Sequence, residues 1–463
     1  MSVQETMGKS SDANLAAPYG GYYSRGVVAP EPELTAVGPG TPMGEYLRSQ
    51  WQPVCLSEQI TDLPLAIRIM GEDLVVFRDK SGRIGILHRH CSHRGTSLEY
   101  GIVSERGIRC CYHGWLFDVD GTILETPGEP PNSKLKNSIF HGAYPALEKN
   151  GLVFAYMGPT DKKPLFPQRE PYDLPCQTVK AFSLDLSNNW LQSYENTMDP
   201  VHSVFLHHRS TGTQLTPAFG EIPHVEYQDT GNGNGMMYIS KRRMNDEMIW
   251  VRHVHCIFPN EAHVGTIFDM DYTVENHFRR VFISRWIVPY DDTSCAMIGW
   301  RFFSDELPGG DASACGYNKI DFGGQTEQPD YESKQRFPGD WEAQASQGPI
   351  AVHAAEHLGA TDTGVALMRR LLRRAVRGEA PAAGSAPEGV DDAVTRLNAE
   401  LAYCQDSVLH VPKHRTSEED WSLLGDVGRK VTDVLIEADG LEGEQRTGQV
   451  VSRLKELTAS YAS

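Results

Sequence analysis

The sequence predicts an α+β protein in which a small all-β domain precedes a larger domain of antiparallel strands and helices. Three observations carry this prediction. Short runs of β-forming residues separated by turn residues fill the stretch from Pro53 to about Met157. Longer strand-like runs then stand beside helical segments between Trp190 and Gly378, and the remaining tail is helical in pattern. Helices beside an antiparallel sheet are typical of α+β folds.

The overall composition is that of a globular protein, and it argues against several classes of partner. The chain has 463 residues, of which 40% are hydrophobic and 22% charged, enough for about three domain-sized units. Its net charge of −18 argues against nucleic acid or an anionic membrane as the main partner. The nine cysteines are mostly scattered, which suggests a reducing compartment. No signal peptide is visible and no run approaches eighteen apolar residues, so we expect a cytoplasmic protein without a membrane span.

Residues 1–40 are expected to form an arm with little regular structure. They are rich in Gly, Pro, Ser and Ala, and such an arm could pack on its own subunit or on a neighbouring one. Thr41 followed by Pro42 is then typical of a helix start, because Thr caps the first turn and Pro fits within it. We expect a short helix running toward Trp51.

Residues 41–160 are assigned to the all-β domain. Turn residues at 79–82 and 118–121 separate its strands. The β-forming runs lie at 66–70, 73–78, 84–87 and 151–156. His88 and His90 are expected to be ordinary strand side chains.

Residues 161–380 are assigned to the second domain, which follows a Pro-rich linker. The stretch from Trp190 to His208 is helical in character. The strand-like runs lie at 236–240, 249–254, 280–286 and 298–303. The polar segment 310–338 is expected to form a loop over a site. Helical periodicity returns at 351–378, where five Arg between Arg369 and Arg377 are expected to form a solvated face.

Residues 381–463 are assigned to a helical C-terminal extension. An Ala/Pro/Gly-rich segment at 379–389 is expected to be a linker, and helical stretches follow at 421–425 and 431–436. The extension carries no catalytic signature, so packing or a subunit contact is its expected role.

Two tight pairs of potential metal ligands lie in the first domain. Cys91 and His93 are separated by one residue, and Cys110 and His113 by two. Two Cys and two His could hold a tetrahedral zinc, but zinc sites usually pair Cys with Cys and His with His. Mixed pairs suit a Rieske 2Fe–2S cluster, in which two Cys bind one iron and two His bind the other. Gly95 and Gly114 would let backbone N–H groups approach the sulfurs.

A second candidate metal site follows in the helical stretch of the second domain. His202 and His207 with a carboxylate would form a facial triad, which binds Fe(II) and leaves coordination positions open for O₂. Residues five apart on an α-helix point about 140° away from each other, against about 40° for residues four apart. We therefore expect a π-bulge or a helix break around 203–206. His208 is a competing ligand that helix geometry does not exclude.

Both motifs resemble those of aromatic-ring-hydroxylating Rieske oxygenases. The quoted segments are Cys91-Ser-His-Arg-Gly95, Tyr112-His-Gly-Trp115, and the run from Glu195 to His207. The resemblance spans most of residues 33–378. It implies an all-β Rieske domain and a helix-grip-like antiparallel-sheet catalytic domain, and its spacing favours His207 over His208. Respiratory Rieske proteins have a disulfide between two further Cys, whereas here the first loop offers no partner for Cys111, which we expect to be a small buried residue.

The resemblance also implies the third iron ligand. Asp340 and Gln344 match the spacing of the phthalate-dioxygenase-like branch, although Gly339 replaces the Gln that precedes the Asp there. We expect His202, His207 and Asp340 to bind the mononuclear iron. Glu342 is the alternative carboxylate.

Asp199 is expected to conduct electrons rather than to bind metal. In the family an Asp at this position bridges a cluster His of one subunit to an iron-bound His of the next. The resemblance thus implies that Asp199 joins His113 of the partner subunit or His93 of the partner subunit to His202 or His207. A carboxylate also fixes the tautomer of a ligating imidazole. Asn196 is expected to lie near the iron as a further polar group.

The resemblance implies an oxygenase that uses O₂ to cis-dihydroxylate an aromatic substrate, with an aromatic carboxylate as the expected class. A buried carboxylate needs a cation, and Arg243 and Arg252 lie in or beside strands that could line the pocket. Monohydroxylation and oxidative O-demethylation use the same ligands and are alternatives. A Rieske electron carrier with no iron beyond the cluster, and a structural zinc protein, are rivals of other classes.

The same resemblance implies the partners. Electrons would come from NAD(P)H through a reductase with flavin and a plant-type 2Fe–2S centre, or through a ferredoxin. The subunit is expected to form a homotrimer or a dimer of trimers.

Overall fold

The computed structural model describes most of the chain. The described residues are 18–19, 29–172, 178–210, 212–230, 233–265, 272–304, 312–319, 330–379, 403–414 and 416–461. Nearly all of the expected N-terminal arm up to residue 28, the linker at 380–389 and much of the expected loop at 310–338 lie outside them.

The predicted helix start at Thr41 is confirmed. Helices α1 (Pro32–Thr35) and α2 (Pro42–Arg48) open the described part, and the Thr41 side chain accepts a hydrogen bond from the Gly44 amide at 3.2 Å. This bond satisfies one of the free N–H groups of the first turn.

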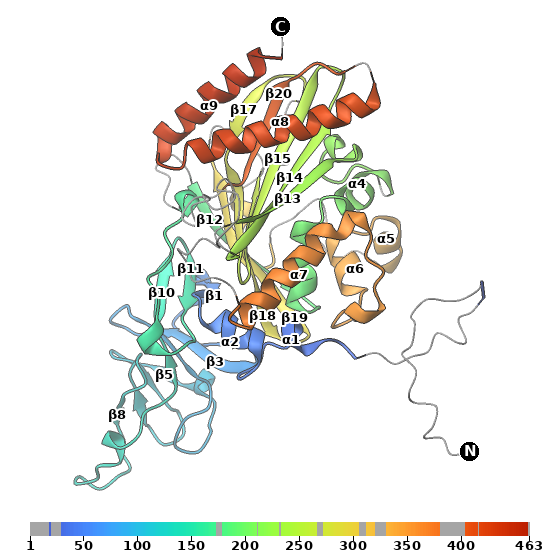
Figure 1. Ribbon diagram of the computed structural model, residues 1–463. Coiled ribbons are helices and arrows are strands. Elements are labelled where there is room, and N and C mark those ends of the chain that lie inside the picture. Colours follow the sequence, from blue (N-terminus) through green and yellow to red (C-terminus); the bar gives the residue numbers. More distant parts are fainter. Residues whose placement is uncertain are drawn as a thin grey trace.

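The first domain consists of three small antiparallel sheets, in the order β1-β11-β10, β2-β3-β4-β9 and β5-β6-β7-β8 (Figure 1). Their strands are β1 (Gln52–Leu56), β2 (Leu65–Ile69), β3 (Glu72–Arg78), β4 (Ile84–His88), β5 (Ile102–Val103), β6 (Ile108–Arg109), β7 (Leu116–Phe117), β8 (Ile123–Glu125), β9 (Ala143–Tyr144), β10 (Ala146–Lys149) and β11 (Leu152–Ala155). Each predicted β run overlaps one of these strands. The loops that carry Cys91 and Cys110 lie after β4 and β6.

The second domain is built on one antiparallel sheet, nine-stranded in the described residues, with β12-β19-β18-β16-β15-β14-β13 as its main path. The strands are β12 (Thr178–Leu186), β13 (His224–Thr230), β14 (Gly235–Arg243), β15 (Met248–Ile257), β16 (Glu261–Gly265), β17 (Asn276–Arg279), β18 (Val281–Asp291), β19 (Ser294–Phe303) and β20 (Gln405–His410). The predicted α+β class is confirmed.

Helices cover both faces of this sheet (Figure 1). The helices are α3 (Trp190–Glu195), α4 (His202–Val204), α5 (Tyr331–Arg336), α6 (Asp340–Ala345), α7 (Thr363–Val376), α8 (Ser417–Glu437) and α9 (Gly443–Ala459). Successive side chains of a strand point to opposite faces. Met237 and Ile239 accordingly pack with α8, whereas Met236 and Tyr238 belong to the core that includes α3 and α7. The site described below lies on the α3 side.

The C-terminal extension contributes a strand as well as helices, which the helical prediction missed. β20 pairs with β15 and β17, so residues beyond 381 complete the sheet of the second domain. Its sequence, Gln-Asp-Ser-Val-Leu-His, shows no alternation of apolar and polar residues because nearly all of the strand is buried. Periodicity therefore could not reveal it.

The prediction of a solvated arginine face on α7 is wrong for Arg369. This side chain is 8% exposed and pairs with Glu195 and Glu356, whereas Arg377, near the end of the helix, is 51% exposed. Arg373 pairs with Glu31. The acidic partners lie far away in the sequence, so a local charge count could not find them. No helix in the described residues is long and apolar enough to cross a membrane.

Acid is expected to destabilise the α8 side of the sheet through His253. This ring is fully buried and hydrogen-bonds Thr432 of α8 and Gln405 of β20, each at 2.9 Å. Burial lowers its pKa to about 3, helped by the charge of Lys241. Because an unfolded His has a pKa near 6.5, stability is full above that value and falls as pH drops toward 3, by up to about 1.4 kcal/mol per pH unit.

The measurement is the free energy of unfolding by urea, from neutral pH to about pH 5, for the wild type and His253→Gln. The difference in the free energy of unfolding between the wild type and His253→Gln should narrow as pH falls, because the variant has no imidazole to protonate at this position. Parallel curves would show that His253 does not titrate with unfolding.

Candidate metal centres and active-site cavity

Two matching loops present the four predicted cluster ligands. In the first, the Cys91 amide donates to the Thr96 carbonyl at 2.9 Å and the Gly95 amide to the Cys91 carbonyl at 2.8 Å. In the second, the Cys110 amide donates to the Trp115 carbonyl at 2.8 Å and the Gly114 amide to the Cys110 carbonyl at 3.1 Å. Both glycines have positive φ angles, 77° and 74°, which other residues rarely adopt. The two loops therefore share one backbone hydrogen-bond pattern and one glycine conformation.

The ligand side chains of these loops come together. The rings of His93 and His113 lie 4.5 Å apart between centroids. Cys91 and Cys110 are both buried and their thiols are within hydrogen-bond contact, while the amides of His93 and Arg94 donate to the Cys91 sulfur. His93 Nδ1 is buried without a hydrogen-bond partner in the described residues. An unpartnered imidazole and adjacent thiols with amide donors fit a 2Fe–2S cluster with mixed ligands.

Cys111 is exposed, not buried as expected. It lies beside Tyr112, itself 60% exposed, at the tip of the second loop. Cys110 is buried and the His113 ring lies against His93, which leaves the two residues between them at the surface. The described cysteines are all free thiols, as the missing partner for Cys111 implied.

The predicted helix irregularity at the second site is confirmed. α4 ends at Val204 and continues as a π-helix, Phe205–Arg209, in which the Ser210 amide donates to the Phe205 carbonyl at 2.8 Å. The wider turn brings a residue five positions on back to the same side of the helix. The His202 and His207 rings thus lie 5.3 Å apart between centroids.

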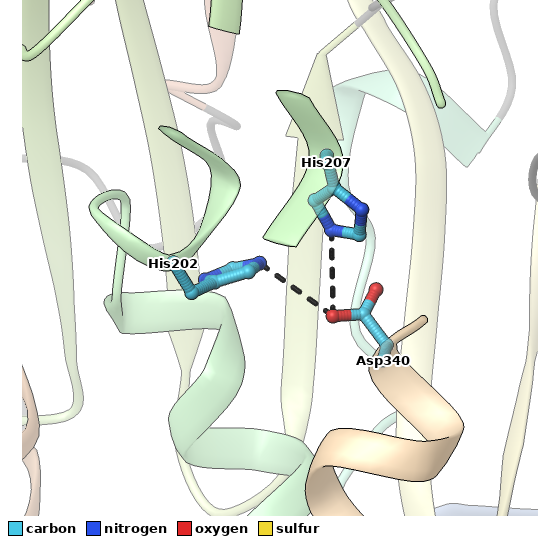
Figure 2. Close-up of side chains that lie close together, drawn as sticks. All are labelled: His202, His207 and Asp340. Atoms are coloured by element: carbon cyan, nitrogen blue, oxygen red, sulfur yellow. Dashed lines mark ion pairs between the residues drawn. The ribbon is translucent and has the colours of Figure 1, made fainter. Parts of the chain in front are cut away.

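Asp340, at the start of α6, completes a three-residue cluster with His202 and His207 (Figure 2). Its Oδ1 lies 3.6 Å from His202 Nε2 and 3.5 Å from His207 Nε2. In the described residues this is the one group of His, Cys, Asp and Glu whose ligand atoms all lie within 4.8 Å of one another. Burial would raise the pKa of Asp340, but the hydrogen bond to His207 and the neighbouring positive charges hold it well below its usual range.

Further polar groups orient this cluster. The Nδ1 of His207 hydrogen-bonds Gln214 Oε1 at 2.9 Å, and the Nδ1 of His202 hydrogen-bonds the Asp199 carbonyl. Both Nε2 atoms are thereby directed toward Asp340. Asn196 Nδ2 donates to Asp340 Oδ1 at 3.1 Å, so Asn196 lies where it was expected. Two imidazoles and one carboxylate with oriented Nδ1 atoms fit a facial-triad iron site.

Neither alternative ligand belongs to this cluster. His208 lies outside it, with its ring against Gly220. Glu342 caps α6 instead, where its carboxylate accepts a hydrogen bond from the Gly339 amide at 2.9 Å.

Asp199 borders the site and is partly open to solvent. Its Oδ1 accepts from the amides of Val201 and His202 at 3.0 and 3.2 Å, and its Oδ2 lies 3.7 Å from His202 Nδ1. The side chain is 27% exposed. It can therefore contact His202 inside the subunit and another molecule outside it.

The cavity beside the cluster has a volume of about 120 Å³. Its apolar lining includes Leu215, Phe219, Val254, Val264, Ile283, Met297 and Trp341. Arg252 also lines it, as expected. The expectation for Arg243 is wrong: its guanidinium pairs with Asp420 at 2.6 Å and is absent from the cavity lining. In the strand register Arg252 pairs with Ser240, so Arg243 lies three residues further along β14 and on the opposite face of the sheet.

A second cavity arginine, Arg285, was not singled out from the sequence. It lies on β18 among buried residues, and its Nη2 donates to Thr197 Oγ1 at 3.2 Å. Burial lowers the pKa of Arg285, and the charge of Asp340 opposes that shift. An Arg inside an otherwise apolar strand was the available signal.

Comparisons with known proteins agree with this architecture. Residues 50–141 match the Rieske [2Fe-2S] domain family. The chain is 46% identical over 466 residues, covering 97% of it and 98% of the relative, to the tert-butanol monooxygenase / tert-amyl alcohol desaturase oxygenase subunit of Aquincola tertiaricarbonis. It is 40% identical to the phenoxybenzoate dioxygenase subunit alpha of Ectopseudomonas oleovorans, covering 75% of this chain and 85% of that one.

Solved structures show the same fold. The protein resembles NdmA of Pseudomonas putida CBB5 with caffeine, with a TM-score of 0.56, 21% identity, and coverage of 72% of this chain and 92% of that one. It also resembles dicamba monooxygenase bound to dicamba, with a TM-score of 0.55, 16% identity, and coverage of 72% and 99%.

A Rieske domain joined to a helix-covered antiparallel sheet defines the class as an iron-dependent oxidoreductase. Within that class, the chain belongs to the oxygenase subunits of the Rieske non-heme iron oxygenases. Its cofactors are a Rieske 2Fe–2S cluster and a mononuclear iron.

Gln214→Ala is expected to weaken binding of the mononuclear iron by about 10- to 100-fold, because the His207 ring loses the partner that orients it. Iron content after dialysis against a chelator measures this loss. Absorbance of the 2Fe–2S cluster serves as the internal control, since Gln214 lies outside the Rieske domain and contacts no proposed ligand of that cluster. Unchanged iron retention would contradict the orienting role.

Proposed function

We propose that Cys91, His93, Cys110 and His113 hold the Rieske cluster and that His202, His207 and Asp340 hold the mononuclear iron. Iron bound there would activate O₂ with electrons delivered from the cluster. The support is the donor set in each place: two thiols with two imidazoles, and two imidazoles with one carboxylate. The residues around each set hold the ligands in position.

The reaction we propose is monooxygenation of a compact, uncharged substrate of the tertiary-alcohol class. One C–H bond becomes C–OH, O₂ supplies the inserted atom, and two electrons and two protons reduce the other atom to water. NAD(P)H is the electron source, through a reductase. The observation that carries this proposal is the whole-chain similarity to the Aquincola subunit, whose name gives tert-butanol and tert-amyl alcohol.

The size of the cavity supports a compact substrate. Its volume of about 120 Å³ is somewhat below the roughly 150 Å³ of an apolar protein cavity that binds benzene. A branched molecule of four or five carbons suits that space and the apolar lining. A two-ring substrate would require the walls to move.

The second candidate is the expected cis-dihydroxylation of an aromatic carboxylate. Arg252 and Arg285 on the cavity wall favour it, because either could face a carboxylate. The similarity to the phenoxybenzoate dioxygenase subunit supports the same class. Oxidative O-demethylation is a variant with its own relative, a 5,5'-dehydrodivanillate O-demethylase oxygenase subunit of Sphingobium, 33% identical over 76% of this chain.

Electron transfer is proposed to cross between subunits through Asp199. The carboxylate contacts His202 on one side and is open on the other. His113 of the partner subunit or His93 of the partner subunit would take the open side. This arrangement calls for a ring of subunits, a homotrimer or a dimer of trimers, supplied by a flavin/2Fe–2S reductase or a ferredoxin.

Product analysis tests the proposal. The holoenzyme, chemically reduced and then exposed to O₂, is given tert-butanol, tert-amyl alcohol or benzoate. A diol from tert-butanol supports the proposed reaction. A cis-diol from benzoate, with no product from the alcohols, supports the second candidate instead. No product from any substrate, with two irons per chain that stay at two after Fe(II) reconstitution, would leave only the electron carrier.

A further inference from the structure

The cavity arginine Arg252 is held by a carboxylate from the C-terminal extension. Arg252 of β15 and Asp406 of β20 are direct partners in the strand register. Arg252 Nη1 lies 3.5 Å from Asp406 Oδ1, and both side chains are buried, 3% and 0% exposed. The Nε1 of Trp250 donates to the same Oδ1 at 2.8 Å. The extension thus places a negative charge beside Arg252, which lines the active-site cavity.

The surrounding backbone is shaped for this carboxylate. A Cβ built on Gly265 of β16 would lie 1.9 Å from Asp406 Oδ2, so only glycine admits the side chain there. The Gly265 carbonyl also accepts a hydrogen bond from Arg252 Nη2 at 3.2 Å. Burial raises the pKa of Asp406 to about 6 against the opposing charge of Arg252, so the carboxylate is still ionised at neutral pH.

The Arg252–Asp406 ion pair affects which substrate charge the cavity favours. A buried arginine without a counter-ion is costly, so it would favour binding of a substrate that carries a carboxylate. With Asp406 in place, Arg252 already has a counter-ion, and the negative charge behind it disfavours a substrate carboxylate in this buried site. Arg285, the other arginine of the lining, is retained in every variant of the test below, so its contribution cancels in the comparison.

We propose that Asp406 is a specificity-determining residue: by neutralising Arg252, it makes the cavity select uncharged, hydroxyl-bearing substrates and reject carboxylates of the same size. This inference rests on the proposed monooxygenation of a tertiary alcohol. It gives the extension a functional role, and the Aquincola relative, which matches over 97% of the chain, shares most of that extension.

The test compares two probes of similar shape, tert-butanol and pivalate, on the full-length holoenzyme. Their dissociation constants are measured anaerobically by calorimetry for the wild type and Asp406→Asn, which keeps the shape and removes the charge. The ratio of the pivalate constant to the tert-butanol constant should fall at least about tenfold in the variant. An unchanged ratio, with wild-type iron content and circular dichroism, would overturn the role of Asp406.

A double variant shows whether the tighter pivalate binding acts through Arg252. In Asp406→Asn/Arg252→Met, the ratio of the two dissociation constants should return to the wild-type value. If pivalate instead binds directly to the iron, its tighter binding will persist in the double variant, which would refute the proposal. Replacing both members of a buried pair is milder than removing one, so this double variant also serves if Asp406→Asn does not fold. In that case a wild-type ratio supports the proposal, and a ratio shifted toward pivalate overturns it.

Asp420→Asn is the matched control. Asp420 also comes from the extension and pairs with an arginine of the sheet, Arg243, but that pair is absent from the cavity lining. The ratio of the two dissociation constants in Asp420→Asn should equal that of the wild type. An equal shift of this ratio in Asp420→Asn and Asp406→Asn would show that the effect comes from a loosened extension, and it would refute the proposal. Failure of the proposed reaction is seen separately, as absence of alcohol product from the wild type.

Discussion

Replacing Asp340 by alanine is expected to remove the mononuclear iron and to lower substrate oxidation by at least about a thousandfold. Asp340 supplies the one carboxylate of the three-residue cluster, at 3.5–3.6 Å from the two Nε2 atoms. Two imidazoles alone leave the iron with fewer bonds and an uncompensated charge. The cluster loops lie in the other domain, so the Rieske signal in electron paramagnetic resonance should persist while iron falls from three to two per chain.

Glu342→Ala is the matched control for Asp340→Ala. Glu342 lies two residues further on the same helix and accepts a hydrogen bond from the Gly339 amide. Its loss should cost about 1 kcal/mol of stability through the helix cap and leave the iron in place. Iron loss in Glu342→Ala together with full iron in Asp340→Ala would reverse the ligand assignment.

What the sequence predicted best were features set by local spacing. The π-helix follows from two His five residues apart that must face one ion, because no regular α-helix permits it. The paired cluster loops follow in the same way from Cys91-x-His93 and Cys110-x-x-His113 with a nearby Gly. These constraints act within a few residues, so the sequence alone predicts them before any fold is known.

What the sequence could not predict were partners that meet only in the folded chain. Arg252 and Asp406 are 154 positions apart, and their pairing depends on β20, a strand without alternation. The choice between Arg243 and Arg252 as a cavity residue depended on which face of its strand each side chain occupies. Arg369 was placed in solvent because Glu195, its partner, is 174 positions away.

Of the variants with an expected loss of stability, Arg369→Met is expected to lower the free energy of unfolding most, by about 3–5 kcal/mol. Arg369 Nε and Nη2 donate to the Glu195 carboxylate at 2.5 and 2.7 Å, and both side chains are less than a tenth exposed. Burial already raises the pKa of Glu195 despite this partner. Removing the guanidinium leaves a buried carboxylate without a counter-ion, and Glu195 must then either take up a proton or draw in water.

The loss should reach the iron site, because Glu195 is followed directly by Asn196, which holds Asp340. Thermal unfolding followed by circular dichroism measures the stability, and iron content measures the site. Arg377→Ala is the matched control: it lies just beyond the end of the same helix and pairs with Glu33, but it is 51% exposed, so its loss should cost at most about 1 kcal/mol. Arg369→Met/Glu195→Gln should recover most of the stability, since the charge that lacked a partner is gone. Equal losses in Arg369→Met and Arg377→Ala would show that burial does not set the strength of these pairs.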